Sequence, residues 1–444
     1  MTVLRLNKLS LENFRCFAQC EVEFHPDLTV LVAENGSGKT AVLDAVAIAM
    51  SQLVNAISKD EELLRISNDD VRLKLDPRAN MVAQFPSSYR MHGTVNDTSV
   101  EWGGTVYVKR RETWPNYRTS KALKMEARHF LSDDAVLPLI GYYRTSRAFR
   151  NTAARQDYRR TSIRNITERV TAYADCFSSR SSTRAILSWF EQRYWEIAHP
   201  AFKESLSVNL ALIAGVQAAA NRVLEPAGWS DFEWNADLQT VTVRHRTQGR
   251  LPYFMLSDGV RTMLALVVDI ARRCASLNPQ LSDQAPVQTP GVLIVDEVDM
   301  HLHPRWQQQV LGLLQSAFPA LQIIVSTHSP HVLSTVDKSS IRVFHIDGED
   351  MRIETPSFQT KGVESADVLA VVMDVDPVPQ LQETDDLRTY RALIEDGKDG
   401  TPEATALRAR LDAHYGPASQ VMVDCDRLIR FQQFRLRHEK PDRT

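Results

Sequence analysis

The sequence predicts an α/β fold, in which short buried strands are combined with helices. An apolar run at 28–32 leads through a glycine-rich turn into a long apolar helix at 40–58. Two further runs rich in Val and Ile, at 292–295 and 323–325, are typical of strands that are buried on both faces. Together these runs predict the central strands of the fold.

Apolar periodicity and turn residues predict the remaining elements. They are strands within 3–33 and 81–108, helices at 184–224 with a break near Pro200, a hairpin at 231–246, an amphipathic helix at 260–274, a loop at 279–290, and a mostly helical region at 357–444 that is broken at Gly397–Pro402. A chain of 444 residues, 43% of them apolar, exceeds one compact domain, so we expect two or three lobes.

Composition argues against several classes of protein. No run of about 18 apolar residues is evident, so no membrane-spanning helix is expected, and residues 1–10 resemble a charged strand rather than a signal peptide. The five scattered cysteines form no Cys-x-x-Cys, which indicates a reducing cytoplasm and argues against structural zinc. The net charge of −3 means that any nucleic-acid binding requires a local basic patch.

The segment AENGSGKT at 33–40 predicts a phosphate-binding loop. Gly36 and Gly38 let backbone N–H groups surround a β-phosphate, and the positive end of the following helix points to the same place. Lys39 is expected to reach the β- and γ-phosphates, and the Thr40 hydroxyl to bind Mg²⁺. Ala33 replaces the usual first glycine, so a reduced nucleotide affinity remains open.

An acidic pair ends the apolar strand that begins at residue 291. Asp296 is expected to hold Mg²⁺, directly or through water, and Glu297 to polarise the attacking water as the general base. Because neighbouring side chains of a strand alternate between its faces, the two carboxylates are predicted to point to opposite sides. An Asp-Glu pair after a strand is common, so its weight comes from the other motifs.

Two more motifs complete a fixed order along the chain. LSDGV at 256–260 opens the amphipathic helix, where Ser257 and Gly259 form a helix start that can face a γ-phosphate. STHSP at 326–330 places His328 at the end of a buried strand, within reach of the same phosphate. Taken alone, Ser257 is better explained as a helix cap and His328 as a structural residue. The order of all four motifs is poorly explained by chance.

These motifs resemble the ATP-binding-cassette superfamily, and within it the RecF, OLD and SMC-like branch. LSLENFRCF at 9–17 and DEVDMHLHPRWQQ at 296–308 look like that branch's versions of the opening strand and the acidic motif. The resemblance implies a P-loop NTPase head with a mixed central sheet flanked by helices, a short helical arm insertion and a small helical C-terminal region. It also implies ATP and Mg²⁺ as cofactors in a head-to-tail dimer. The implied nucleotide contacts are Arg15, Asn35, Gly36, Ser37, Gly38, Lys39 and Thr40 of one subunit and Ser257, Asp258 and Gly259 of the other.

A narrower resemblance comes from LPLIGYYRTSR at 137–147 together with LSDG. Both are similar to small ATPases of bacterial antiphage systems, the Septu PtuA family, including versions that accompany retrons. The resemblance implies that a separate effector nuclease of the HNH type, similar to PtuB, is controlled by this chain. We accordingly divide the chain into an ATPase lobe at 1–147, an arginine-rich and helical arm at 148–230, a second lobe at 231–356 and a helical region at 357–444. The glutamine that usually links lobe and insertion is not identified, and Gln84 is a weak candidate.

The insertion between Lys39 and Ser257 distinguishes this chain from two other branches of the superfamily. It is longer than a transporter nucleotide-binding domain needs. Its helical part, at 184–224, has no sustained heptads and no Cys-x-x-Cys hook, so a long SMC or Rad50 coiled coil is excluded. A short arm remains.

Arginines cluster at the start of the insertion. Between Arg144 and Arg169 the chain has eight arginines and only two acids, and Tyr142, Tyr143, Phe149 and Tyr158 are interspersed. Arginine with aromatic residues suits phosphate contacts and base stacking, so this patch is a candidate site for DNA or retron nucleic acid. A solvated loop or a surface that pairs with acids of another subunit explains the pattern almost as well. Arg144 and Arg147 are alternatively nucleotide contacts.

No nuclease is predicted in this chain. VDCDR at 423–427 imitates the Asp-x-Asp of a metal-dependent nuclease, but a helical Asp pair is the better interpretation. His301 and His303 are assigned to a contact between subunits rather than to a metal. Three functions stay open: a defence ATPase that gates an effector, a stand-alone DNA-repair ATPase like RecF, and a regulatory nucleotide-binding module with little turnover.

Overall fold

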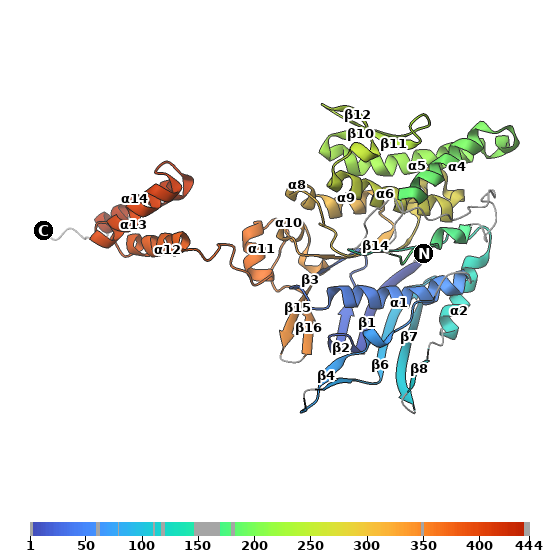
Figure 1. The fold of residues 1–444 in the computed structure, drawn as a ribbon, viewed down its shortest axis with the longest axis horizontal. Helices are drawn as coiled ribbons and strands as arrows, with labels where there is room; N and C mark the ends of the chain where they lie inside the picture. Colours follow the sequence, from blue (N-terminus) through green and yellow to red (C-terminus); the bar gives the residue numbers. More distant parts are fainter. Residues whose placement is uncertain are drawn as a thin grey trace. The chain divides into compact units, whose positions relative to one another are not determined.

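The computed structural model describes residues 3–58, 63–78, 80–109, 112–116, 120–145, 169–178, 183–347 and 350–438 (Figure 1). The chain divides into two compact units, Met1–Val368 and Leu369–Thr444. The second unit begins at Leu369, later than the boundary at 357 that the sequence pattern suggests.

A six-stranded mixed sheet forms the centre of the first unit, in the order β16-β15-β3-β14-β13-β9. Its strands are β3 (Leu28–Val32), β9 (Leu139–Tyr143), β13 (Gly291–Val295), β14 (Leu321–Thr327), β15 (Ile341–Asp347) and β16 (Asp350–Glu354). All pairs are parallel except β15 with β16. Every residue of β3, β9, β13 and β14 is buried, which explains their continuous apolar sequences. The predicted mixed central sheet is confirmed.

A second, antiparallel sheet has the order β2-β1-β6-β7-β8. Its strands are β1 (Leu4–Phe14), β2 (Phe17–Glu23), β6 (Ser87–Val95), β7 (Thr98–Lys109) and β8 (Glu112–Asn116). The buried side chain of Gln322 in β14 joins the two sheets, because its amide accepts from the Leu6 N–H at 2.7 Å and donates to the Leu6 carbonyl at 2.8 Å.

Helix α1 (Lys39–Ile57) packs between the two sheets, with β9 and β14 on one side and β6 and β7 on the other (Figure 1). By length and composition it is apolar enough to cross a membrane, which the sequence analysis did not anticipate. Its most apolar window is 83% buried inside the protein. The apolar composition of α1 is therefore accounted for by its place in the core.

Helices cover the opposite face of the central sheet (Figure 1). They include α4 (Thr183–Ala198), α5 (Leu206–Leu224), α6 (Asp258–Leu277) and α9 (Val310–Ala317), and a 3₁₀ turn at Pro200–Ser205 makes the predicted break. The predicted hairpin is confirmed as β10 (Trp229–Asn235) and β11 (Thr240–His245), to which β12 (Gly249–Pro252) adds a third strand. The predicted loop at 279–290 is wrong: it forms a 3₁₀ helix, Pro279–Gln284, and α7 (Ala285–Gln288). Each has a proline in its first turn, where proline favours a helix.

Shorter elements complete the first unit. They are the hairpin of β4 (Leu73–Leu75) and β5 (Met81–Ala83), helices α2 (Lys121–Ala127), α8 (Pro304–Gln307), α10 (Pro330–Leu333) and α11 (Ser365–Val372), which runs into the second unit, and 3₁₀ turns at Asn68–Asp70, Arg128–Leu131, Val170–Tyr173, Glu225–Ala227, Tyr253–Met255 and Lys338–Ser340.

The second unit is built from three helices, α12 (Gln382–Glu395), α13 (Pro402–Tyr415) and α14 (Gln420–His438). Its core is formed by Tyr390, Ile394, Ala404, Leu407, Leu411, Met422 and Cys425. The predicted break at Gly397–Pro402 is confirmed, and the Thr401 hydroxyl caps α13 by accepting from the Ala404 N–H. VDCDR lies within α14, as the interpretation of a helical Asp pair requires.

Candidate nucleotide-binding site

A cavity of about 400 Å³ opens where four segments of the first unit meet. These are the turn after β1, the loop after β3, and the ends of β13 and β14. The lining residues are Arg15, Cys16, Asn35, Gly36, Ser37, Gly38, Lys39, Thr40, Ala41, Asp296, Glu297 and His328. The structure thus brings together the predicted phosphate loop, the acidic pair, the histidine and Arg15.

The loop after β3 needs its glycines for two reasons. Gly36 and Gly38 have φ of 83° and 88°, a left-handed backbone that favours glycine. A Cβ atom on Gly38 would also lie 2.5 Å from Cys16 Sγ and 2.6 Å from the Phe17 ring, so the loop packs tightly against the turn after β1. Ala33 is not among the residues with positive φ, so its backbone angle does not require glycine.

Lys39 is held ready for an anion. Its buried side chain donates from Nζ to the carbonyls of Ala33 at 2.8 Å and Glu34 at 2.9 Å. Burial lowers the pKa of Lys39 to about 8, although the nearby Asp296 and Glu297 partly oppose this shift. A bound phosphate would place a further negative charge beside the buried ammonium and so stabilise its charged form.

Asp296 is oriented by three hydroxyl groups. Its Oδ2 accepts from Thr40 at 3.1 Å and Thr145 at 2.8 Å, and its Oδ1 accepts from Ser326 at 2.5 Å. The Ser326 hydroxyl in turn accepts from the Glu297 N–H at 2.8 Å. These contacts fix the carboxylate at the end of β13, beside the first turn of α1.

The donor set beside Asp296 fits Mg²⁺. Within the described parts of the chain, no three His, Cys, Asp or Glu side chains are grouped so that they could hold a metal ion. The Thr40 hydroxyl and the Asp296 carboxylate are hard oxygen ligands, and proteins commonly bind Mg²⁺ through one or two such ligands together with substrate phosphates. A metal that enters with a nucleotide therefore suits this cavity better than one bound by the protein alone.

Glu297 and His328 face the same cavity as Asp296, so the prediction that the two carboxylates point to opposite sides is wrong. Strand β13 ends at Val295, and Glu297 has a φ of 47°, so the alternation of a strand does not apply to it. Burial and the charge of Lys39 lower the pKa of His328, so its imidazole is neutral at pH 7. A neutral imidazole can donate a hydrogen bond to a phosphate oxygen.

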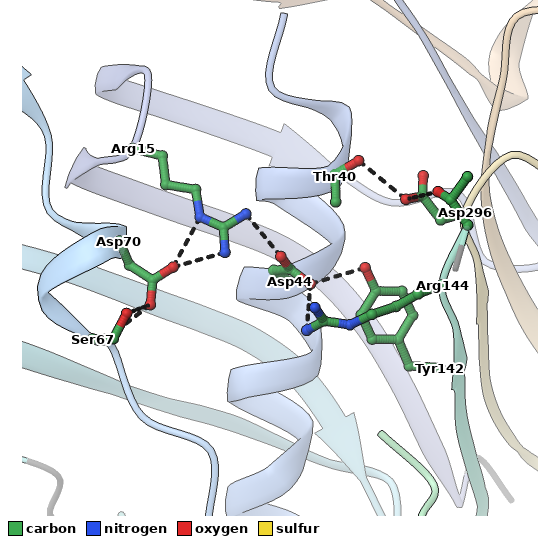
Figure 2. A network of polar contacts seen from close by, with 9 residues as sticks. Arg15, Thr40, Asp44, Ser67, Asp70, Tyr142, Arg144 and Asp296 are labelled. Carbon is green, nitrogen blue, oxygen red and sulfur yellow. Dashed lines mark hydrogen bonds and ion pairs between the residues drawn. The ribbon is translucent and has the colours of Figure 1, made fainter. Parts of the chain in front are cut away.

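Arg15 belongs to a network that sequence analysis missed (Figure 2). Its guanidinium contacts Asp44 at 2.7 Å and Asp70 at 2.7 and 2.8 Å. Asp44, in the second turn of α1, also accepts from Arg144 at 2.8 Å and from the Tyr142 hydroxyl at 2.9 Å. Burial by itself would lower the pKa of Arg15, but the two carboxylates outweigh it and raise that pKa. A single charged residue inside the apolar sequence TAVLDAVAIAM was the one available signal for Asp44.

The signature residues lie away from this cavity. Ser257 and Asp258 are exposed, and none of Ser257, Asp258 and Gly259 lines it. Gly259 is packed so closely that a Cβ atom would lie 2.7 Å from the His301 carbonyl oxygen. The start of α6 and the segment after the acidic pair therefore form one continuous surface.

The side chains of two other predicted residues bond to nearby backbone groups. The His303 ring accepts from the Arg305 N–H at 3.3 Å and so caps α8. Gln84 donates to the Val82 carbonyl at 3.0 Å and does not line the cavity.

The predicted arginine-rich patch needs correction at both of its ends. Arg169 is 2% exposed and donates to backbone carbonyls, including that of Leu277 at 2.7 Å, so it cannot bind a nucleic acid. Arg144 is paired with Asp44, and Tyr142 and Tyr143 are buried in β9, where their rings cannot stack on bases. The rest of the patch, including Arg147, Phe149 and Tyr158, lies outside the described residues.

Comparison with known proteins gives matches to family models, to relatives and to solved structures. The family model AAA_21, described as "AAA domain, putative AbiEii toxin, Type IV TA system", matches residues 106–334, and AAA_23, "AAA domain", matches 8–187. The chain is 25% identical to "Retron Ec83 probable ATPase" of Escherichia coli over 95% of this chain and 86% of that protein. It is 37% identical to "Septu protein PtuA" of Bacillus mycoides over 17% of this chain and 10% of that protein. Among solved structures, the "SMC head domain from Thermotoga maritima" aligns with 13% identity and a TM-score of 0.41 over 80% of this chain and all of that one.

Proposed function

The chain belongs to the AAA_21 family, and on this premise we propose that it is a Mg²⁺-dependent ATPase of the SMC and RecF type that acts in bacterial antiphage defence. The observation that carries the ATPase proposal is the convergence of Lys39, Thr40, Asp296, Glu297 and His328 on one cavity, although they come from three distant parts of the chain. No single motif among them would carry it.

All lining residues except Cys16 and Ala41 have a proposed role. The N–H groups of Asn35–Gly38 and the ammonium of Lys39 bind the β- and γ-phosphates. Thr40 and Asp296 hold Mg²⁺, which when bound neutralises charge on the phosphates. Glu297 polarises the attacking water, and neutral His328 donates to the γ-phosphate. Arg15, at the mouth of the phosphate loop, contacts the nucleotide while Asp44 and Asp70 hold its guanidinium.

A second copy of the chain completes the site in this proposal. Ser257 and Asp258 are exposed at the start of α6, where backbone N–H groups and the helix dipole favour an anion. They do not line the cavity of their own chain. A head-to-tail dimer with two bound ATP molecules would use both surfaces.

The defence role rests on the relatives. The retron ATPase is similar along almost the whole chain, whereas the Septu match is confined to a short segment. We propose that ATP binding or hydrolysis in the cytoplasm gates a separate effector nuclease of the HNH type, similar to PtuB, with DNA or a retron nucleic acid as the sensed partner. The alternatives are a repair ATPase, since RecF of Staphylococcus epidermidis is 32% identical over 16% of this chain, and a regulatory module with little turnover.

Two substitutions test the ATPase proposal. Lys39→Ala should abolish ATP binding, measured by isothermal titration, because the phosphates lose their cation. Glu297→Gln should bind ATP but hydrolyse it about 10²–10⁴ times more slowly, because the water loses its base. Lys124→Ala, on the exposed surface of α2, is the matched control and should behave as wild type. A Glu297→Gln variant with the wild-type rate would show that the assigned base is wrong.

A co-purification experiment tests the defence proposal. The natively expressed protein would be isolated under mild conditions, and its eluate analysed by mass spectrometry and by nucleic-acid extraction. A bound nuclease or a reverse-transcribed DNA supports the gated effector. A homo-oligomer that binds only added DNA favours the repair ATPase.

A further inference from the structure

The second unit exposes an aromatic and basic face on α14. We propose that this face, defined by Arg427, Arg430, Phe431, Phe434 and Arg435, binds single-stranded nucleic acid. The proposal rests on the proposed function only for the idea that the chain has a nucleic-acid partner. It assigns that partner to a surface that the sequence patterns did not indicate.

Two large aromatic side chains are exposed side by side on α14. Phe431 is 60% exposed and Phe434 is 62% exposed. Residues three apart on a helix are neighbours on its surface, so the two rings lie on one face. Burying a phenylalanine is worth about 1.5–3 kcal/mol in general, so two exposed rings together are an uncommon surface feature for a small helical unit.

Arginines border these rings. Arg427, Arg430 and Arg435 are exposed, and at 3.6 residues per turn they fall on the same side of α14 as Phe431 and Phe434. No acidic residue occurs between 427 and 435. Asp424 pairs with Arg427 of this face at 3.0 Å, whereas Asp426 pairs with Arg408 of α13, so the three arginines of the face outnumber its acid. The surface around the two phenylalanine rings therefore carries a net positive charge.

Several other apolar residues of α14 form or border the core of the unit. Met422 and Cys425 are buried there, and Leu428 and Ile429 pack against them. Among the exposed residues between 427 and 435, the only apolar ones are the aromatic Phe431 and Phe434. Rings bordered by arginines suit bases and phosphates, and because protein interfaces also use aromatic residues and arginine, a protein partner is the alternative that the test has to exclude.

The occupant is a single strand rather than a duplex. Bases inside a duplex are stacked on one another and offer no free face to Phe431 or Phe434, whereas bases of a single strand do. Base–aromatic stacking tolerates any base, so little sequence preference is expected. The arginines would contact the phosphates and make the affinity depend on salt.

The test uses the full chain and fluorescence anisotropy with labelled oligo(dT) and with an RNA of the same length. Phe431→Leu with Phe434→Leu keeps apolar side chains but removes the rings, and should weaken binding at least tenfold. Phe431→Tyr with Phe434→Tyr keeps the rings and should bind as wild type. Arg430→Gln with Arg435→Gln should lower the slope of log affinity against log salt by roughly 1.4, at about 0.7 for each phosphate contact.

Controls separate this proposal from the ATPase. Arg388→Gln, on α12 and paired with Asp385, removes an exposed arginine of the same unit outside the face and should bind oligo(dT) normally. All variants of the α14 face should bind ATP as the wild type does. Lys39→Ala tests only the proposed ATPase function, so its result does not affect the proposal for α14. Unchanged oligo(dT) and RNA binding by the double Leu variant would overturn the proposal. If that variant instead loses a protein partner while it keeps nucleic acid, the face docks a protein and the proposal is wrong.

Discussion

At the scale of single residues, the sequence revealed the groups expected to touch a nucleotide but not the groups that hold them. Lys39, Asp296 and His328 stand out because each belongs to a motif. Asp44, Thr145 and Ser326 do not stand out, although Thr145 and Ser326 lie within quoted motifs, because their significance comes from contacts with residues far away in the chain. The pairing of Thr145 with Asp296, for example, becomes visible only when β9 lies beside β13.

Thr145 is a positioning residue for Asp296, and its replacement gives the first prediction. Thr145→Val removes one of the three hydroxyls that orient the carboxylate, so the Mg²⁺ dependence of ATP binding should shift to about 10–100 times higher metal concentration. Titration of Mg²⁺ against the binding of a fluorescent ATP analogue measures this. Thr145→Ser restores the hydroxyl and should restore the wild-type curve. Equal curves for Val and wild type would contradict the role.

Lys39 makes ATP affinity depend on pH. Its pKa of about 8 in the free protein should rise when phosphates bind, because they stabilise the charged ammonium. Binding therefore takes up a proton above pH 8, and the affinity should fall as pH rises, approaching tenfold per unit at most. Measurements between pH 7.5 and 9.5 avoid the ionisation of the phosphate itself, near pH 6. In Lys39→Arg, whose guanidinium stays charged, the affinity should not depend on pH in this range.

At the scale of elements, continuous apolar runs were the reliable signal. They identified β3, β13 and β14, whose environments are apolar on both faces. They were misleading at β9, an apolar run that leads directly into the arginine-rich segment. β9 was interpreted partly as the start of a basic surface, because Tyr142 and Tyr143 precede arginines. Their hydroxyls instead bond to Asp44 and Asp269, and only the fold supplies those partners.

A buried ion pair network fixes α6 to β9. Asp269 accepts from the Tyr143 hydroxyl at 2.6 Å and from Arg273 at 2.9 Å, and Arg273 donates to the Ala172 carbonyl at 2.7 Å. Burial alone would raise the pKa of Asp269, but Arg272 and Arg273 outweigh it and hold that pKa well below its usual range. The helix that presents Ser257 is thereby attached to the central sheet.

Asp269→Asn should lower the free energy of unfolding by about 3–5 kcal/mol, because it leaves two buried guanidinium groups without their anion. The pKa of Asp269 is lower in the folded than in the unfolded protein. Its contribution is therefore complete above roughly pH 4 and is lost as the pH falls below that value. Urea unfolding at pH 7 and at about pH 2 measures both effects, with the exposed Asp237→Asn as control. An unchanged midpoint at pH 7 would refute the account.

At the scale of the whole molecule, the sequence pattern predicted a separate helical region but placed the start of the second compact unit too early in the chain. Residues 357–368 still belong to the first unit, since the Thr360 hydroxyl donates to the Val336 carbonyl at 2.7 Å. Such a contact between segments has no signature in the sequence. The surface of α14 escaped notice for a similar reason, because only the three-helix arrangement shows which side of α14 faces the solvent.

ATP should control the association of two copies. Glu297→Gln with ATP and Mg²⁺ should elute as a dimer in size-exclusion chromatography with light scattering, because the nucleotide between the subunits is not hydrolysed. Adding Ser257→Arg should return it to a monomer, since an arginine would block the partner's phosphates from the exposed start of α6. Ala211→Arg, on α5 away from that start, is the control for an added charge. A dimer that persists in the Ser257→Arg protein would place the contact elsewhere.

The close packing of Cys16 against Gly38 supplies a built-in chemical reporter. Cys16 is the one exposed thiol among the five cysteines, and it lines the phosphate cavity. Burial of its neighbourhood raises the pKa of this thiol, so alkylation should be slow at neutral pH and faster in mild alkali. A bound nucleotide would shield the sulfur. When the unmodified protein is treated with a maleimide, mass spectrometry measures the fraction of chains that are labelled at Cys16 after a given time. A lower labelled fraction in the presence of ATP therefore reports the fraction of occupied sites, and no engineered probe is needed.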